Sequence, residues 1–244
     1  MINHKPCSYR NSRQVLYDYL TQSLPYFSNL ILNPTIINQT MTNNPSRRDI
    51  NRQRRALTEQ QRRNAGSMAF RFLSKLTPRL PKGAKVGIYL DDFGELPTQP
   101  LLKWCQRMGY QAYLPVINTQ GRDNKHIRFV PIYHSKLANI PTVRHSFGMK
   151  ESKSRHLLSA DELDLIMCPL VAADEQGNRM GMGGGFYDTT LAKSYQYSSS
   201  QNHRRHPLRV GWCHEFQVFD ELETQPWDVP LNALITPEKI RWFS

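Results

Sequence analysis

The chain has 244 residues with a formal net charge of +12, 39% hydrophobic residues and a mean hydropathy of −0.59. No apolar stretch approaches the roughly 18 residues that a membrane span requires. The four cysteines are far apart and form no CxxC pair, so a zinc site or a disulfide framework is not expected. The N-terminus shows no basic-then-apolar signal pattern. We therefore expect a cytoplasmic protein with no membrane partner.

The first 45 residues differ in composition from the rest. They are rich in Asn, Ser, Thr and Tyr, and they end in the loop-like stretch TIINQTMTNNPS. We expect residues 1–45 to form a poorly ordered extension, although residues 9–27 are compatible with a short helix and Met41 with a later start of translation. Residues 46–244 are expected to form a single α/β domain.

The positive charge is concentrated in one short segment. Residues 46–65 contain seven Arg against Asp49 and Glu59. Such a segment indicates a nucleic-acid contact, a site for a polyanionic small molecule, or a solvated helix face.

Helices and strands alternate along the chain. A helix is predicted from Arg47, and a capping box at Thr58–Gln61 predicts that a second helix starts there. Its apolar stripe runs through Leu76 until Pro78 and Pro81 end it. Strands are predicted at residues 85–90, 110–116, 127–132, 163–172, 208–213 and 231–236. Two further helices are predicted at residues 97–109 and 187–195. This order predicts an α/β fold with a mostly parallel central sheet flanked by helices, in a Rossmann-like three-layer architecture.

The segment RMGMGGGFYD, residues 179–188, contains four glycines between a predicted strand and a predicted helix. Backbone N–H groups that no side chain covers, at the start of a helix, suit a phosphate. Arg179 would donate hydrogen bonds to its oxygens, and Asp188 would bind an Mg²⁺ ion that the phosphate also contacts. The segment fits neither the Walker A pattern nor G-x-G-x-x-G. A tight turn in which Asp188 only caps the helix is the structural alternative.

The segment PLVAADEQGNRMGMGGGFYDTTL, residues 169–191, resembles the signature of the 5-formyltetrahydrofolate cyclo-ligases, also called 5,10-methenyltetrahydrofolate synthetases. Residues 47–58 are similar to the basic first helix of that family. Residues 89–98 are similar to its substrate-side loop, and residues 227–237 to its closing segment. The resemblance spans about residues 47–240.

The resemblance implies an enzyme that converts 5-formyltetrahydrofolate and ATP to 5,10-methenyltetrahydrofolate, ADP and phosphate. It implies that Arg47 and Arg179 contact the phosphates, that Asp188 binds Mg²⁺, and that Arg179 and Tyr187 are catalytic. The loop that wraps the phosphates would comprise Gly181, Met182, Gly183, Gly184, Gly185, Phe186 and Tyr187.

On the folate side, the resemblance implies that Glu95 hydrogen-bonds the pterin ring and that Leu90 lines the same pocket. Phe147 or Met149 would cover it. A second metal-site Asp of some relatives falls at Asn232 here, which leaves Asp228 as a weak substitute. Taken alone, Arg47 is equally compatible with a solvated helix face, whereas Glu95 by itself favours a surface loop residue and Phe147 favours core packing.

The sequence is also compatible with two other functions. The Arg-rich stretch 47–63 is compatible with a nucleic-acid-binding protein, although it lacks interleaved aromatic residues and a groove-reading motif. Another enzyme that uses ATP or a sugar phosphate is also compatible with the scaffold. The cyclo-ligase interpretation predicts small-molecule partners, no nucleic acid and a monomer.

Overall fold

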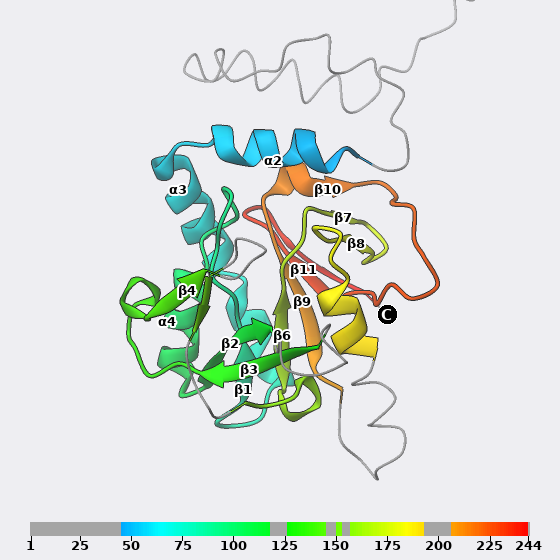
Figure 1. The fold of residues 1–244 in the computed structure, drawn as a ribbon. Coiled ribbons are helices and arrows are strands. Elements are labelled where there is room, and N and C mark those ends of the chain that lie inside the picture. The colour runs from blue at the N-terminus through cyan, green and yellow to red at the C-terminus, as the bar shows by residue number, and fades with distance from the viewer. Residues whose placement is uncertain (1–44, 118–125, 145–149, 153–156, 193–205, 244) are drawn as a thin grey trace, which may run out of the picture. The chain divides into compact units, whose positions relative to one another are not determined.

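A seven-stranded sheet in the order β12-β11-β9-β6-β1-β2-β3 organises the computed structural model (Figure 1). Its strands are Lys85–Gly87 (β1), Gln111–Ile117 (β2), Ile127–Pro131 (β3), Leu165–Cys168 (β6), Leu208–Trp212 (β9), Ala233–Ile235 (β11) and Ile240–Trp242 (β12). Neighbours from β2 to β11 run parallel, while the edge strands β3 and β12 are antiparallel to theirs. The predicted mostly parallel sheet is therefore confirmed.

The structure describes residues 45–117, 126–144, 150–152, 157–192 and 206–243. All of them belong to one compact unit, Thr42–Ser244. The division into an extension, residues 1–45, and a domain, residues 46–244, stays a prediction, because residues 1–44 lie outside the described ones. None of the helices in the described ranges is long and apolar enough to cross a membrane.

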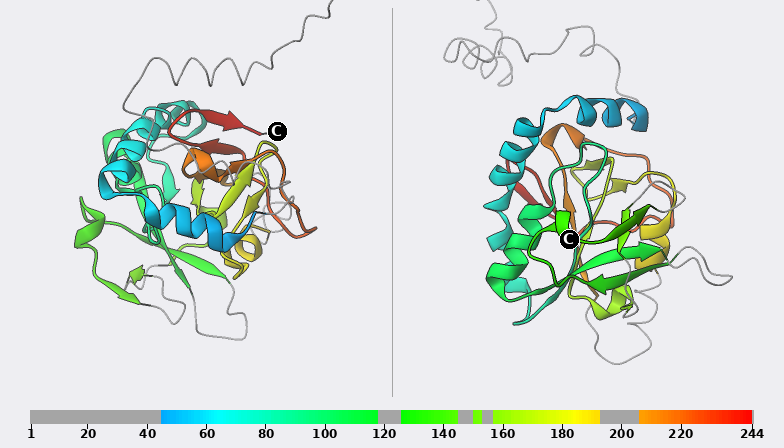
Figure 2. Two further views of the ribbon diagram at one scale, coloured as in Figure 1. Left: turned by 90° about the horizontal axis from the view of Figure 1, so that it is seen from above. Right: turned by 60° about the vertical axis from the view of Figure 1, so that its left-hand side comes forward.

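Helices cover both faces of the sheet. The helices are Arg47–Ala56 (α2), Glu59–Phe70 (α3) and Gln99–Met108 (α4), and residues 186–192 are also helical. Helices α3 and α4 pack on one face, where a cluster with fully buried Leu73 and Leu101 forms the larger core. Phe186 and Tyr187 pack into a second cluster on the other face. Figure 2 shows the cyan helices and the yellow helix on opposite sides of the sheet, which confirms three layers.

Local signals explain where the helices begin and end. The side chains and backbones of Thr58 and Gln61 form the predicted capping box of α3. Gly109 ends α4 in the left-handed conformation, with φ of 68°. The helix predicted through Leu76 is wrong in its length, because α3 ends at Phe70 and two 3-10 turns follow. In a 3-10 turn residues three apart share a face, so Leu73 and Leu76 both remain buried.

The strand predicted at 163–172 is also wrong in its length. It ends at Cys168, before Pro169, and the chain then enters a three-stranded sheet in the order β10-β7-β8. These strands are Ala172–Asp174 (β7), Arg179–Met180 (β8) and Val218–Phe219 (β10), and β4 (Thr142–Arg144) pairs with β5 (Lys150–Ser152). The 3-10 helices are Leu73–Lys75, Thr77–Arg79, Leu137–Asn139, Ala160–Glu162 and Glu215–Gln217. Asp174 turns the β7–β8 hairpin by accepting hydrogen bonds from the backbone of Gln176 and Asn178.

The order of the strands reverses at β1. The chain leaves β1 toward β2 on one side and later returns as β6 on the other. In open α/β sheets, ligands bind in the crevice at the carboxyl ends of the two strands that flank such a switch point. Helix α2 lies over this end of the sheet, where its Ile50 packs against Val171, Met180 and Leu222.

Candidate active site

The glycine loop joins β8 to the helix that begins at residue 186. Gly183 and Gly185 have φ of 96° and 70°, a region that residues with a Cβ rarely adopt. A Cβ on Gly184 would lie 2.8 Å from the ring of Phe186. The backbone conformation therefore favours glycine at Gly183 and Gly185, and a side chain at Gly184 would have to displace the Phe186 ring.

Gly181 is different. Its φ is not positive, and a Cβ at this position would meet only Nη1 of Arg179, at 3.8 Å, an ordinary contact. Neither backbone strain nor crowding within the described residues accounts for a glycine here. The space beside Gly181 belongs to the cavity described below.

Arg179 and Asp188 form a buried ion pair beneath the loop. Nη2 of Arg179 donates to Oδ1 of Asp188 at 2.5 Å, and the two side chains are 2% and 20% exposed. The same oxygen accepts a longer bond from the backbone N–H of Val229, at 3.4 Å. The Nε atom of Arg179 is buried and has no hydrogen-bond partner in the described part of the chain. One donor of the guanidinium is therefore not used by the described residues.

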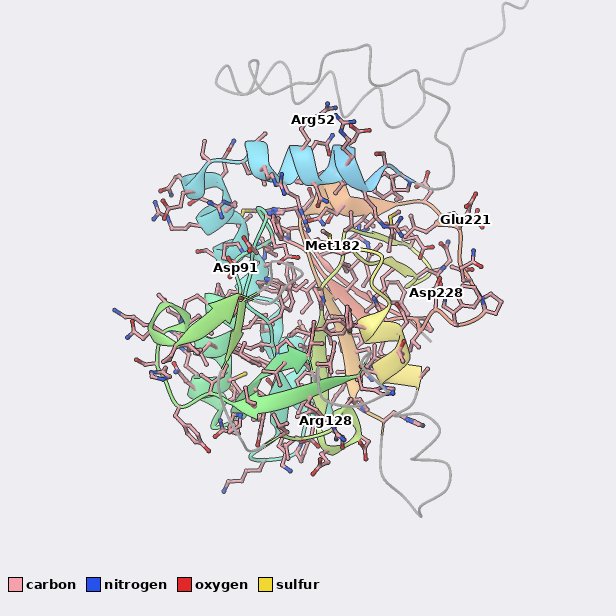
Figure 3. The ribbon with its side chains drawn as sticks, in the orientation of Figure 1. Arg52, Asp91, Arg128, Met182, Glu221 and Asp228 are labelled. Atoms are coloured by element: carbon pink, nitrogen blue, oxygen red, sulfur yellow. The ribbon has the colours of Figure 1, made fainter. Side chains whose placement is uncertain are left out.

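Helix α2 holds the loop from the other side. Nε of Arg47 donates to the carbonyl oxygen of Gly181 at 2.9 Å, and the amide of Asn51 approaches the sulfur of Met182 at 3.9 Å. Figure 3 shows Met182 below this helix. Arg47 is therefore not merely a solvated residue, because it contacts the predicted phosphate loop.

Glu95 lies in the loop after β1, with its side chain 14% exposed. Its Oε2 accepts from the backbone N–H of Asp92 at 3.0 Å, and its Oε1 lies 3.5 Å from Nη1 of Arg54. Burial raises the pKa of Glu95 to about 7, although Arg54 and the Asp92 N–H favour the ionised form. Near neutral pH this carboxyl group therefore exists in both protonation states.

Tyr187 lies at the start of the helix and faces the same cavity. Its hydroxyl group is buried and has no hydrogen-bond partner among the described residues. Burial raises the pKa of Tyr187 well above its usual value, so the hydroxyl keeps its proton at any ordinary pH. A bound ligand could satisfy this donor.

The glycine loop, Arg47, Arg179, Asp188, Glu95 and Tyr187 line one cavity of about 750 Å³. Among the predicted site residues, the cavity is lined by Arg47, Leu90, Glu95, Arg179, the loop Gly181–Gly185, Phe186, Tyr187 and Asp188. Predicted Phe147 and Met149 lie outside the described residues. Asn232 is not among the lining residues; its side chain accepts a hydrogen bond from the backbone of Arg209 at 3.0 Å, within the main sheet.

Sequence reasoning did not single out several other lining residues: Asp92, Phe93, Pro115, Ile117, Ile127, Glu223, Gln225 and Trp227. Trp227 is 66% exposed and lies beside Asp228, on the loop between β10 and β11 that Figure 3 shows. An exposed Trp at a cavity offers a planar surface for a ring. The sequence signal that could have indicated Trp227 is its position in the segment 227–237, which is similar to the closing segment of the family.

The residues that could hold a metal are sparse. Within the described ranges, no group of three or more His, Cys, Asp and Glu side chains is arranged to hold a metal ion. Asp188 offers carboxylate oxygen at the glycine loop, but one of its oxygens is engaged by Arg179. A divalent cation at this place would need most of its oxygen ligands from a bound polyphosphate and from water.

Comparisons with known proteins agree with this geometry. The model of the 5-formyltetrahydrofolate cyclo-ligase family matches residues 39–237. The 5-formyltetrahydrofolate cyclo-ligase of Escherichia coli K12 is 35% identical over 191 residues, which cover 78% of this chain and 98% of that protein. The enzyme of the same name from Haemophilus influenzae is 34% identical over 152 residues, which cover 62% and 74% of the two chains.

A solved structure also resembles this fold. The NMR structure of the Aquifex aeolicus 5,10-methenyltetrahydrofolate synthetase superimposes with a TM-score of 0.59 at 27% identity, over 80% of this chain and 90% of that one. The family match covers most of the chain and includes the glycine loop, α2 and the loop after β1. The chain is therefore an enzyme that belongs to the 5-formyltetrahydrofolate cyclo-ligase family.

Proposed function

We propose that this enzyme converts 5-formyltetrahydrofolate and ATP to 5,10-methenyltetrahydrofolate, ADP and phosphate. The observation that carries the proposal is the cavity itself, which combines a glycine loop and a buried Arg179 with the buried carboxyl group of Glu95. The glycine loop and Arg179 suit a polyphosphate, and the carboxyl group of Glu95 suits a ring with adjacent N–H donors. Family membership supports the same reaction.

The chemistry explains why such a reaction consumes ATP. The formyl oxygen is a poor leaving group, and N10 of the folate is a weak nucleophile toward an amide-like carbon. The oxygen attacks the γ-phosphorus and ADP leaves; N10 then attacks the formyl carbon, loses its proton, and phosphate departs with the oxygen. The protein needs no covalent nucleophile and acts by positioning and by neutralising charge.

In this proposal the glycine loop and the N–H groups at the start of the helix hold the phosphates. Arg179 and Arg47 neutralise them, and Tyr187 donates a hydrogen bond to the reacting oxygens. Asp188 would be the protein ligand of Mg²⁺, which when bound draws charge from the phosphates. The Nε donor of Arg179 and the hydroxyl of Tyr187, which have no hydrogen-bond partner among the described residues, fit this assignment.

The folate would occupy the part of the cavity that Leu90 and Glu95 line. The ionised carboxylate would accept hydrogen bonds from the pterin, and Leu90 would pack on the ring. Phe147 and Met149 stay candidates for covering it.

The alternative nucleic-acid function gains no support from the first helix. Arg47 donates a hydrogen bond to the glycine loop and Arg54 is buried, so two of the Arg residues contact the enzyme's own loops. The absence of nucleic acid, a cytoplasmic location and a monomeric state stay predictions.

The test is the absorbance of the methenyl-folate band after purified protein is mixed with 5-formyltetrahydrofolate, Mg²⁺ and ATP. We expect a rise that depends on ATP and releases one phosphate per methenyl group. ATP turnover that a different small molecule stimulates, with no methenyl band, would indicate the other ATP-using enzyme. Polynucleotide binding that falls steeply with salt would indicate the nucleic-acid alternative.

Gly181→Ala tests whether a ligand approaches the loop closely. We expect the KM for ATP to rise about tenfold, equivalent to about 1.4 kcal/mol, because a methyl group would enter the phosphate site. The melting temperature should stay near that of the wild type, because no described atom crowds this position.

Gly183→Ala is the matched comparison. Its φ of 96° makes any Cβ strained, so we expect it to lower the free energy of unfolding by about 1–3 kcal/mol. Wild-type ATP affinity in Gly181→Ala would show that the phosphates do not approach Gly181.

A further inference from the structure

Arg54 is a buried cation at the point where the order of the strands reverses. It lies on α2 seven residues after Arg47, roughly 10 Å farther along the same face of the helix. Its side chain is 1% exposed and does not line the cavity. The proposed reaction assigns no role to this residue.

The guanidinium of Arg54 bridges the two loops that form the crevice. Nη1 donates to the carbonyl oxygen of Leu170, after β6, at 3.2 Å, and lies 3.5 Å from Oε1 of Glu95, after β1. Nη2 donates to Oδ1 of Asn51 at 2.5 Å. This bond holds the guanidinium of Arg54 against α2, the helix that carries both residues. One side chain thus fixes both walls of the switch point relative to α2.

The backbone of the loop after β1 is pressed against the same turn of α2. A Cβ on Gly94 would lie 2.4 Å from the carbonyl oxygen of Arg54, so only glycine fits there. His214 also contacts the carbonyl oxygen of Gly94, with Nε2 at 3.3 Å. The loop that presents Glu95 therefore contacts both α2 and the residue pair that follows β9.

A buried ion pair is by itself weak evidence for a role in stability. Desolvating an ion pair costs several kcal/mol per ion, and an apolar pair of the same volume is often more stable. The Nε atom of Arg54 is also buried without a hydrogen-bond partner among the described residues. Such departures from good packing are concentrated at functional sites.

The charges that face Glu95 come from several elements. Arg54 on α2 favours the ionised carboxylate, whereas Asp91 and Asp92 on its own loop oppose it. Tyr89 before the loop and Tyr187 on the helix beyond the cavity also interact with Glu95, but burial raises the pKa of both, so they stay neutral. Burial lowers the pKa of His214 to about 4, so this ring is neutral at neutral pH. Arg54 is thus the cation that these interactions place against Glu95.

We propose that Arg54 is a positioning residue for the folate site, which favours the ionised form of Glu95 and holds its carboxylate toward the cavity. This inference rests on the proposed function of Glu95 as the group that binds the pterin. Arg54 acts through Glu95 and through the Leu170 carbonyl, and it does not touch the substrate.

The experiment measures the affinity for 5-formyltetrahydrofolate between pH 6 and pH 9 by calorimetric titration, and kcat at saturating substrate. In the wild type the affinity should rise with pH through a midpoint near 7, as Glu95 ionises. In Arg54→Met the midpoint should move upward by about one pH unit or more, since an opposite charge at this range lowers a carboxyl pKa by about 1–3 units. At pH 7 the affinity should fall about five- to tenfold, while kcat at high pH changes little.

Three further variants make the result decisive. Arg54→Lys keeps the positive charge but loses the two separate nitrogen donors of the guanidinium. We therefore expect a folate affinity between those of the wild type and Arg54→Met. Glu95→Gln should bind weakly at every pH and show no midpoint. Arg52→Met removes an exposed charge from the same helix and should match the wild type.

Arg54→Met with a wild-type midpoint would overturn the proposal, even if its melting temperature fell. If Arg54→Met does not fold, wild-type affinity and midpoint in Arg54→Lys would overturn it. Wild-type folate binding by Glu95→Gln would instead overturn the assigned role of Glu95, which separates a failure of the proposed function from a failure of this inference.

Discussion

Asp188→Asn is expected to lower kcat by about 100- to 1,000-fold, the usual cost of removing one group that stabilises transition-state charge. In the proposed reaction the carboxylate binds Mg²⁺ and also orients Arg179 through the bond at 2.5 Å. The amide has the same shape but carries no charge. Turnover is measured from the methenyl band over a range of Mg²⁺ concentrations, where the variant should need more Mg²⁺ to reach its lower maximum.

The same substitution has a cost in stability that must be separated from its effect on turnover. Arg179 is 2% exposed, so the loss of its counter-ion should lower the free energy of unfolding by about 2 kcal/mol. The double variant Arg179→Gln/Asp188→Asn removes both charges and should regain most of this stability without regaining turnover.

Asp220→Asn is the control for Asp188→Asn, because it removes an exposed carboxylate outside the cavity. It should leave both turnover and the free energy of unfolding at wild-type values. Near-normal kcat in Asp188→Asn at every Mg²⁺ concentration would remove the metal role and leave Asp188 as the structural partner of Arg179.

Tyr187→Phe is expected to change activity and stability in opposite directions. The hydroxyl is buried without a partner among the described residues, so its removal should raise the free energy of unfolding by about 1 kcal/mol. In the proposed reaction the hydroxyl donates to oxygens that gain negative charge, so kcat/KM should fall about 100-fold. Chemical denaturation and the methenyl assay measure the two effects.

Tyr133→Phe provides the matched comparison, since Tyr133 is 83% exposed and its hydroxyl is hydrated with or without ligand. It should change neither quantity. A Tyr187→Phe variant that is less stable than the wild type and equally active would show that the hydroxyl serves the fold and not the reaction.

Much of the fold follows from local signals in the sequence. Short apolar runs that alternate with helical patterns predicted a mostly parallel sheet, and the capping box and Gly109 predicted two helix boundaries correctly. The lengths of the strands were harder to predict from the sequence. Residues 163–172 read as one strand, but pairing stops at Cys168, because the backbone after it turns away to form a second sheet.

The glycine loop shows how far a motif leads. Its order and composition indicated a phosphate site, and they placed Arg179 and Asp188 near it. The sequence did not show that these two side chains pair with each other, because that contact depends on how the helix from residue 186 folds back against β8. Nor did it show that Gly181, unlike Gly183, has no structural need to be glycine.

The Arg-rich helix α2 shows most clearly what the sequence determines and what only the tertiary structure determines. By itself the sequence determined that α2 is a helix with dense positive charge, since propensity and charge are properties of neighbouring residues. Only the tertiary structure decided that Arg52 faces solvent while Arg54, two residues later, is buried between Leu170 and Glu95. Burial depends on which distant segments pack on each face of a helix, and here those segments are the loops after β1 and β6, which only the sheet brings together.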